Sequence, residues 1–160
     1  MKVMLAAVGR LKDSGERELY ERYAGRFHAS GRTLSLGPLT LSEHPESRAT
    51  EPALRKADEG TRLLKATKDA NAIIVLDQAG RLDSSADFAK RLATLRDGGV
   101  ATLAFLIGGP DGHGPDVLAN ARDTLSLGRM TLPHGLARVV LAEQLYRAVT
   151  ILSGHPYHRA

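Results

Sequence analysis

Two short apolar runs constrain the fold of this chain most strongly. The first covers residues 72–76 and ends at Asp77, and the second covers residues 101–107 and ends in Gly-Gly-Pro-Asp-Gly-His-Gly. A strand with one solvated face alternates polar and apolar residues, whereas a continuous apolar run suits a strand that is buried on both faces. The two runs therefore predict the central strands of a parallel sheet.

Strand and helix patterns alternate around these two runs. Further strands are expected at residues 2–8, near 125–127 and, weakly and at an edge, over 33–41. Helices are expected from an N-cap at Ser14 to about 27, over 51–67, from a cap at 83–84 to about 96, from 115, and from 134 to about 153. This order predicts an α/β fold, a mostly parallel sheet with flanking helices. The chain has 160 residues and no linker or repeat, so residues 1–160 are expected to form one domain.

The composition excludes several classes of protein. Cysteine is absent, which rules out a disulfide framework, a thiolate metal site and a cysteine nucleophile. The six histidines are scattered without a carboxylate cluster, so no metal is expected. No apolar run approaches the ~20 residues of a membrane helix, and the first residues do not form a secretory signal. We expect a soluble, cytoplasmic protein without a membrane partner.

The charge of the chain favours a polyanionic partner only slightly. The net charge is +4 and the pI is about 9.6. Aromatic residues make up only 4% of the chain, which argues against a base-stacking platform of the RRM or OB type.

The glycine-rich stretch that follows the second apolar run is the first candidate site. In an open parallel sheet, ligands bind at the carboxyl ends of the central strands, and four glycines fall within residues 108–114. A tight turn would also use glycine, but this density favours close approach of the backbone to a ligand. The stretch matches neither Walker A nor G-x-G-x-x-G, and Pro110 lacks a backbone donor. A ligand without phosphates is therefore favoured, and backbone groups could bind an adenine edge and a ribose.

The last helix carries a broad apolar face and two apolar residues, Val140 and Ile151, on its polar side. This pattern predicts packing on the sheet and, on the second side, on a partner subunit. Arg138 lies within the apolar arc, so it is expected either to meet a carboxylate or to line a site. Glu143 and Arg147 have the i, i+4 spacing of a surface ion pair.

The five residues at positions 155–159 follow this helix and contain two histidines, a tyrosine and an arginine. They could form a frayed basic tail, or Tyr157 could anchor them to the surface.

Five stretches together resemble one known family. They are Leu76-Asp77, Phe105–Gly112, Leu125–His134, Arg138–Ala148 and His155–Arg159. They resemble the RlmH (YbeA-type) SPOUT methyltransferases, and the opening strand also fits, so that the resemblance runs nearly end to end. It implies a C-terminal trefoil knot and a homodimer. It also implies methylation of N3 of a pseudouridine in 23S ribosomal RNA, not DNA, within the ribosome, with S-adenosyl-L-methionine as donor.

The resemblance also implies roles for particular residues. The cofactor would be held mostly through backbone groups, by Leu76, Gly108, Gly109, Gly112, Leu127, Gly128, Arg129, Met130, Thr131 and Leu132. The imide N3–H of a pseudouridine is a weak acid, so the reaction needs groups that accept its proton and stabilise the anion. The candidates for catalysis are Arg138, His155, Tyr157, His158 and Arg159, which could be delivered across a dimer interface.

Two rival functions remain open at this point. A related SPOUT enzyme acting on tRNA would share the glycine loop but usually carries an additional RNA-binding segment. A non-catalytic, flavodoxin-like nucleotide-binding module would bind flavin or nucleotide and would not need residues 155–159. The modest charge is poorly suited to gripping free RNA across many phosphates, which favours recognition of an assembled ribosomal site.

Overall fold

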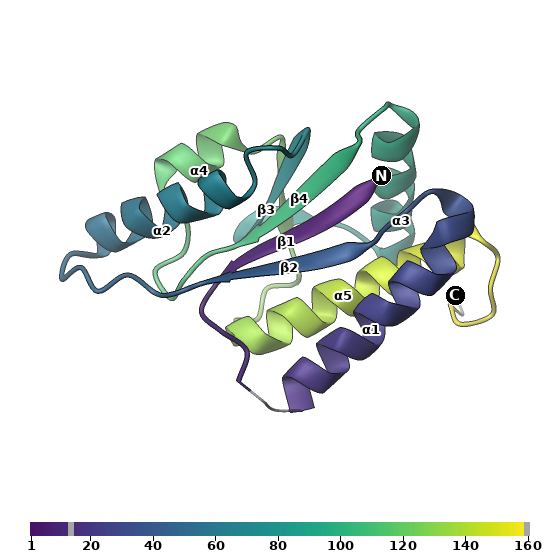
Figure 1. The fold of residues 1–160 in the computed structure, drawn as a ribbon, viewed down its shortest axis with the longest axis horizontal. Helices are drawn as coiled ribbons and strands as arrows, with labels where there is room; N and C mark the ends of the chain where they lie inside the picture. The colour runs from purple at the N-terminus through teal and green to yellow at the C-terminus, as the bar shows by residue number, and fades with distance from the viewer. Residues whose placement is uncertain (13–14, 159–160) are drawn as a thin grey trace.

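The computed structural model describes residues 1–12 and 15–158. Five strands form one sheet in the order β2-β1-β4-β3-β5, and all neighbouring strands run parallel. The strands are β1 (Lys2–Val8), β2 (Leu39–His44), β3 (Ala72–Leu82), β4 (Thr102–Ile107) and β5 (Asp123–Ser126). Their carboxyl ends therefore meet at one edge of the sheet, on the left in Figure 1.

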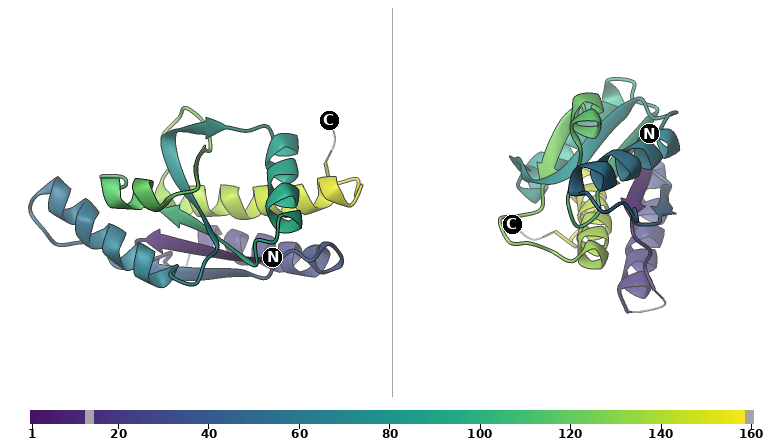
Figure 2. Two further views of the ribbon diagram at one scale, coloured as in Figure 1. Left: turned by 90° about the horizontal axis from the view of Figure 1, so that it is seen from above. Right: turned by 90° about the vertical axis from the view of Figure 1, so that its left-hand side faces the viewer.

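Helices cover both faces of this sheet. They are α1 (Gly15–Gly31), α2 (Pro52–Ala66), α3 (Ser85–Asp97), α4 (Pro115–Asn120) and α5 (His134–Leu152), with a 3-10 turn, η1 (Arg32–Leu34), after α1. Helices α1, α3 and α5 pack on one face, and α2 and α4 pack on the other (Figures 1 and 2). None of the helices within the described ranges is long and apolar enough to cross a membrane.

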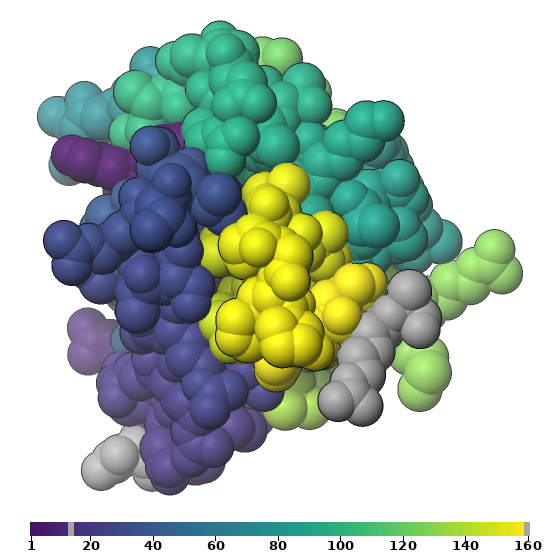
Figure 3. All heavy atoms as spheres, turned by 90° about the vertical axis from the view of Figure 1, so that its right-hand side faces the viewer, coloured from purple at the N-terminus to yellow at the C-terminus, as the bar shows by residue number. Residues whose placement is uncertain are grey.

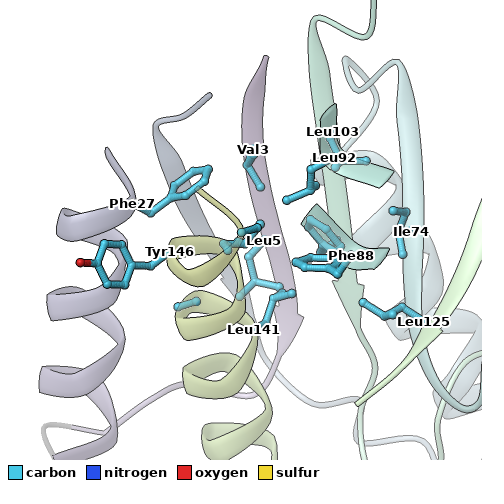
Figure 4. Close-up of a cluster of buried hydrophobic side chains, with 14 of the residues drawn as sticks. Val3, Leu5, Phe27, Ile74, Phe88, Leu92, Leu103, Leu125, Leu141 and Tyr146 are labelled. Carbon is cyan, nitrogen blue, oxygen red and sulfur yellow. The ribbon is translucent and has the colours of Figure 1, made fainter. Parts of the chain in front are cut away.

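Successive residues of the central strands enter two separate hydrophobic clusters. Leu5 and Ile74 belong to the cluster beneath α1, α3 and α5 (Figure 4), whereas Ala6 and Val75 belong to the cluster beneath α2 and α4. Because side chains alternate across a strand, burial of both faces requires an unbroken apolar run. The two apolar runs are the adjacent strands β3 and β4, as predicted.

The structure extends or shifts several predicted boundaries. The weak strand over residues 33–41 is wrong in its first half, because residues 32–34 form η1 and the edge strand begins only at Leu39. Left-handed backbone at Ser35 (φ 54°) and Gly37 (φ 99°) turns the chain there, while Leu36 is buried from the loop. Helix α1 continues four residues beyond the predicted end at 27, and Ser14, its predicted N-cap, lies outside the described residues.

Other boundaries follow the predicted signals. Ser84 caps α3, since its side chain accepts a hydrogen bond from the Asp87 N–H at 3.1 Å. Strand β3 runs past Asp77 to Leu82, with an irregularity in its pairing to β5 between Leu76 and Arg81.

Candidate active site

A pocket of about 460 Å³ lies at the carboxyl edge of the sheet, where β3, β4 and β5 end. This edge faces the viewer in the right-hand panel of Figure 2. Residues 76–78, 107–113, 125–128 and 130–132 form its walls, together with His134 and Ala137 from the first turn of α5. Segments far apart in the sequence therefore meet at the position where an open parallel sheet binds ligands.

The glycine loop forms the wall at the end of β4 because side chains do not fit there. The Gly109 carbonyl accepts a hydrogen bond from the Gly112 N–H at 2.9 Å, which folds the loop back on itself. A Cβ atom on Gly108 would lie 3.0 Å from the Gly112 oxygen and 3.1 Å from Cε1 of His113. Gly112 has a φ of +78°, in the region that favours glycine. The backbone of this loop is thus exposed to a ligand, as the density of glycine predicts.

Helix α2 supports the glycine loop from behind. Glu59 is 3% exposed and accepts a hydrogen bond from the Ser47 N–H at 2.9 Å, and its carboxylate lies where a Gly109 side chain would be. Arg55 donates from Nε to Asp111 at 2.6 Å, and this hydrogen bond lowers the pKa of Asp111. A loop held by a buried carboxylate and an ion pair is organised before any ligand arrives.

Residues 125–132 form the opposite wall. The Ser126 hydroxyl donates to the Gly128 carbonyl at 3.0 Å and lies 3.2 Å from the Gly128 nitrogen, which fixes the turn where Gly128 has a φ of +138°. Gln78 donates from Nε2 to the Thr131 hydroxyl at 2.7 Å and so joins this wall to the end of β3.

Most of the predicted cofactor residues line this pocket. They are Leu76, Gly108, Gly109, Gly112, Leu127, Gly128, Met130, Thr131 and Leu132, whereas Arg129 is exposed and is not part of the lining. His113 and His134 also line the pocket, although the sequence pattern predicts no role for either residue. Only their positions in the sequence indicate the site, because each residue directly borders a glycine or proline motif.

His113 is a titratable residue enclosed by the pocket wall. Burial lowers the pKa of its imidazole, and the nearby carboxylate of Asp77 opposes this shift only in part. The ring is therefore neutral at pH 7, which is consistent with a Nε2 atom that is buried without a hydrogen-bond partner.

Acidification should therefore destabilise the fold through His113. The unfolded chain binds this proton near the ordinary pKa of about 6.5, so the folded state loses stability as pH falls below that value, until the lowered pKa is reached. For one titrating group, the free energy of unfolding can change by at most about 1.4 kcal/mol per pH unit. Urea unfolding at pH 7.5 and 5.5 should show a smaller loss for His113→Gln than for the wild type. His28→Gln, at an exposed position of α1, is the matched control, and an equal loss in all three proteins would contradict this role for His113.

Arg138 does not line the pocket. Its side chain is 2% exposed and forms an ion pair with Glu43 at 2.8 Å. It also donates to the Val8 carbonyl at 2.7 Å and to the Gly9 carbonyl at 3.0 Å. The sequence left two alternatives for Arg138, a carboxylate partner or a place in the site. The structure shows that it pairs with the carboxylate of Glu43. The guanidinium is directed toward the ends of β1 and β2 and away from the residues that line this pocket.

The C-terminal residues dock onto the other end of α5. Tyr157 donates from its hydroxyl to Glu143 at 3.1 Å, and its ring lies 4.7 Å from the ring of Tyr146. Arg147 forms the predicted ion pair with Glu143 and places its Cζ 4.9 Å from the Tyr157 ring centroid. Burial and the hydrogen bonds of Tyr157 raise the pKa of its phenol. Residues 155–158 are thus anchored by Tyr157 rather than frayed.

This docking keeps the predicted catalytic tail away from the pocket of its own chain. His134 lines the pocket, and Tyr146 contacts Tyr157. The rise of 1.5 Å per residue places these two helix positions about 18 Å apart, and it places Ala137 of the lining about 9 Å from Glu143, which accepts the hydrogen bond of Tyr157. His155, Tyr157 and His158 are absent from the described lining of the pocket, and Arg159 lies outside the described residues.

A family model described as "Predicted SPOUT methyltransferase" matches residues 1–158. The chain belongs to the SPOUT methyltransferase family. It is 52% identical over 160 residues to the "Ribosomal RNA large subunit methyltransferase H" of Xanthobacter autotrophicus and 49% identical to that of Brucella anthropi, with 100% of each chain covered in both comparisons.

A solved structure shares the fold of this SPOUT methyltransferase. The probable methylase family protein from Haemophilus influenzae Rd KW20 matches with a TM-score of 0.54 at 15% identity, covering 99% of this chain and 70% of that chain. The family confirms the predicted SPOUT-type parallel sheet and excludes the flavodoxin-like binding module.

Proposed function

We propose that this SPOUT methyltransferase transfers a methyl group from S-adenosyl-L-methionine to N3 of a pseudouridine in 23S ribosomal RNA. The observation that carries the proposal is full-length similarity, near 50% identity, to proteins named as ribosomal RNA large subunit methyltransferase H. This name favours large-subunit rRNA over the tRNA alternative. The assembled ribosome would be the substrate, in the cytoplasm.

The lining of the pocket suits this cofactor. Asp77 and Asp111 are its two carboxylates, and the described lining contains no lysine or arginine. Such a lining disfavours a phosphate group and is compatible with a sulfonium cation. Leu76, Ile107 and Leu132 supply apolar surface, and the glycine loop supplies exposed backbone groups that could bind an adenosyl group. When bound, S-adenosyl-L-methionine supplies an electrophilic methyl group.

The close approach of two segments supports a C-terminal trefoil knot. A Cβ atom on Gly80 would lie 2.7 Å from the carbonyl carbon of Leu125, so the end of β3 passes directly against the backbone of β5. Residues 76–78 and 125–132 then form two walls of one pocket. The knot would hold these segments together within one domain.

A homodimer would complete the active site. Tyr157 docks on α5 about 9–18 Å along the helix from the first turn, which lines the pocket, so the tail groups would act on the pocket of the partner. Leu82, Met130 and Leu136 are 56%, 82% and 40% exposed, and large apolar side chains at the surface suit an interface between subunits.

In this arrangement the tail residues would accept the proton from N3 and stabilise the resulting negative charge. His158 would relay the proton from the imide, and Arg159 would stabilise the anionic base or hold a phosphate. His155 and Tyr157 would position these groups. The attack on the methyl group is an in-line displacement, which requires positioning more than covalent catalysis.

The glycine loop provides a direct test of the cofactor pocket. Gly108→Ala should weaken the binding of S-adenosylhomocysteine about tenfold in calorimetry, because the new methyl group would push against the Gly112 carbonyl and the His113 ring. Gly25→Ala is the matched control, because a Cβ atom there meets nothing within 4 Å. Equal affinity of both variants for the ligand would remove the loop from the binding site.

Tritium transfer from labelled cofactor tests the function itself. Ribosomes that lack the modification should accept methyl groups, whereas ribosomes without the target pseudouridine and naked rRNA should accept few or none. Transfer to tRNA, or equal transfer to ribosomes with and without the target pseudouridine, would overturn the proposal.

A further inference from the structure

Three of the four tyrosines of the chain gather at the end of α5 that is remote from the pocket. Tyr23 of α1 lies 6.3 Å from Tyr146 of α5, and Tyr146 lies 4.7 Å from Tyr157. Figure 3 looks onto this side of the molecule, with the C-terminal residues in yellow beside α1 in dark blue. A chain with few aromatic residues therefore concentrates them beside its docked tail.

Arg26 completes this cluster at the surface. Its Cζ lies 5.8 Å from the ring centroids of both Tyr23 and Tyr146. The residue is exposed, and it forms no ion pair with any residue in the described ranges. Two other arginines nearby differ in this respect, because Arg22 pairs with Glu18 and Arg147 pairs with Glu143.

Aromatic rings beside a guanidinium group restrict its motion and so favour the binding of an anion. Both rings lie within cation–π distance of the Arg26 guanidinium and restrict its long side chain, so less conformational entropy is lost when a ligand binds. The planar edge, with its N–H donors, remains free and matches the oxygens of a phosphate. An exposed, oriented and uncompensated guanidinium is thus suited to a polyanion.

We propose that Arg26, held by Tyr23 and Tyr146, binds a backbone phosphate of the substrate RNA next to the nucleotide that the tail engages. The inference rests on the proposed function, in which the tail of one subunit meets the pocket of the other. Tyr146 contacts both Arg26 and Tyr157, which places Arg26 beside the docked tail. The site would contribute affinity and register and would take no part in methyl transfer.

Steady-state methylation of ribosomes by Arg26→Ala tests this proposal, with Arg22→Ala on the same helix as the matched control. The KM for ribosomes should rise about tenfold in Arg26→Ala. The slope of log KM against log salt should fall by about 1, the value expected for the loss of one phosphate contact. The kcat and the affinity for S-adenosylhomocysteine should change less than twofold. Arg26→Lys should recover the charge but only part of the affinity, since an ammonium group lacks the planar fork.

Four outcomes would overturn the assignment, three of them in kinetics and assembly and the fourth in ribosome binding. The first is a KM within twofold of the wild type in Arg26→Ala, and the second is an equal rise in Arg22→Ala. The third is a weakened dimer in analytical ultracentrifugation, which would show that Arg26 pairs with the partner subunit instead of RNA. Cosedimentation with ribosomes separates this inference from the proposed function. If the wild type transfers no methyl group, the proposed function is wrong. If the wild type and Arg26→Ala bind ribosomes equally well, the proposed phosphate site is wrong.

Discussion

Arg138→Met should lower the free energy of unfolding by about 3–5 kcal/mol, because it removes one partner of a buried ion pair. Arg138 is buried, and Glu43 would lose the guanidinium at 2.8 Å and keep only Arg17, at 3.2 Å, and the Leu11 N–H, at 2.6 Å, as partners. The carbonyls of Val8 and Gly9 would lose their donors as well. Burial lowers the pKa of Arg138, so the wild-type contact already balances desolvation against attraction.

Thermal and urea unfolding measure this loss, with a fall in Tm of roughly 6–20 °C expected for a domain of this size. Arg22→Ala removes an exposed i, i+4 pair and should change the free energy of unfolding by at most about 0.5 kcal/mol. Glu43→Gln combined with Arg138→Met should cost less than the sum of the two single changes, since each single change already removes the ion pair between the two side chains. Additive effects in this cycle would show that the two side chains do not interact.

The position of Arg138 also shows what the sequence alone could predict. Its place in an apolar helical arc predicted a partner or a site, but Glu43 lies 95 residues away in the chain. No local pattern identifies a partner at that separation, because the contact forms only when β2 and α5 are placed beside β1. The central strands were predictable for the opposite reason, since burial on both faces leaves its mark within each strand.

The candidate site divides in the same way. The glycine loop was identified from local composition, and residues 127–132 from a family resemblance, and both line the pocket. The location of the docked tail was not predictable. Its contacts with Glu143 and Tyr146 depend on how the chain turns back after Gly154, which has a φ of +68°. Helix α5 separates the docking position of Tyr157 from the pocket, and the proposed mechanism therefore takes the catalytic groups from a second subunit.

Removal of residues 155–160 should lower kcat at least 100-fold and leave the binding of S-adenosylhomocysteine within twofold, because the pocket contains none of these residues among the described ones. The single variants His158→Ala and Arg159→Ala should each retain part of the activity. Calorimetry and single-turnover methylation of ribosomes separate the two effects. Unchanged methylation by the truncated protein would remove the tail from catalysis.

Mixed dimers distinguish a tail that acts on the partner from one that acts on its own chain. Gly108→Val should destroy the pocket and keep the tail, and the truncated chain should do the reverse. If tails act across the interface, a mixed dimer contains one intact pocket facing one intact tail. Half of the dimers in an equal refolded mixture are mixed, so activity should return to about a quarter of the wild-type value per subunit. If tails act within their own chain, every subunit lacks one half of the site and the mixture stays inactive. The truncated protein alone, refolded in the same way, gives the baseline methylation activity. Activity above this baseline in the mixture would show that each tail acts on the pocket of the partner.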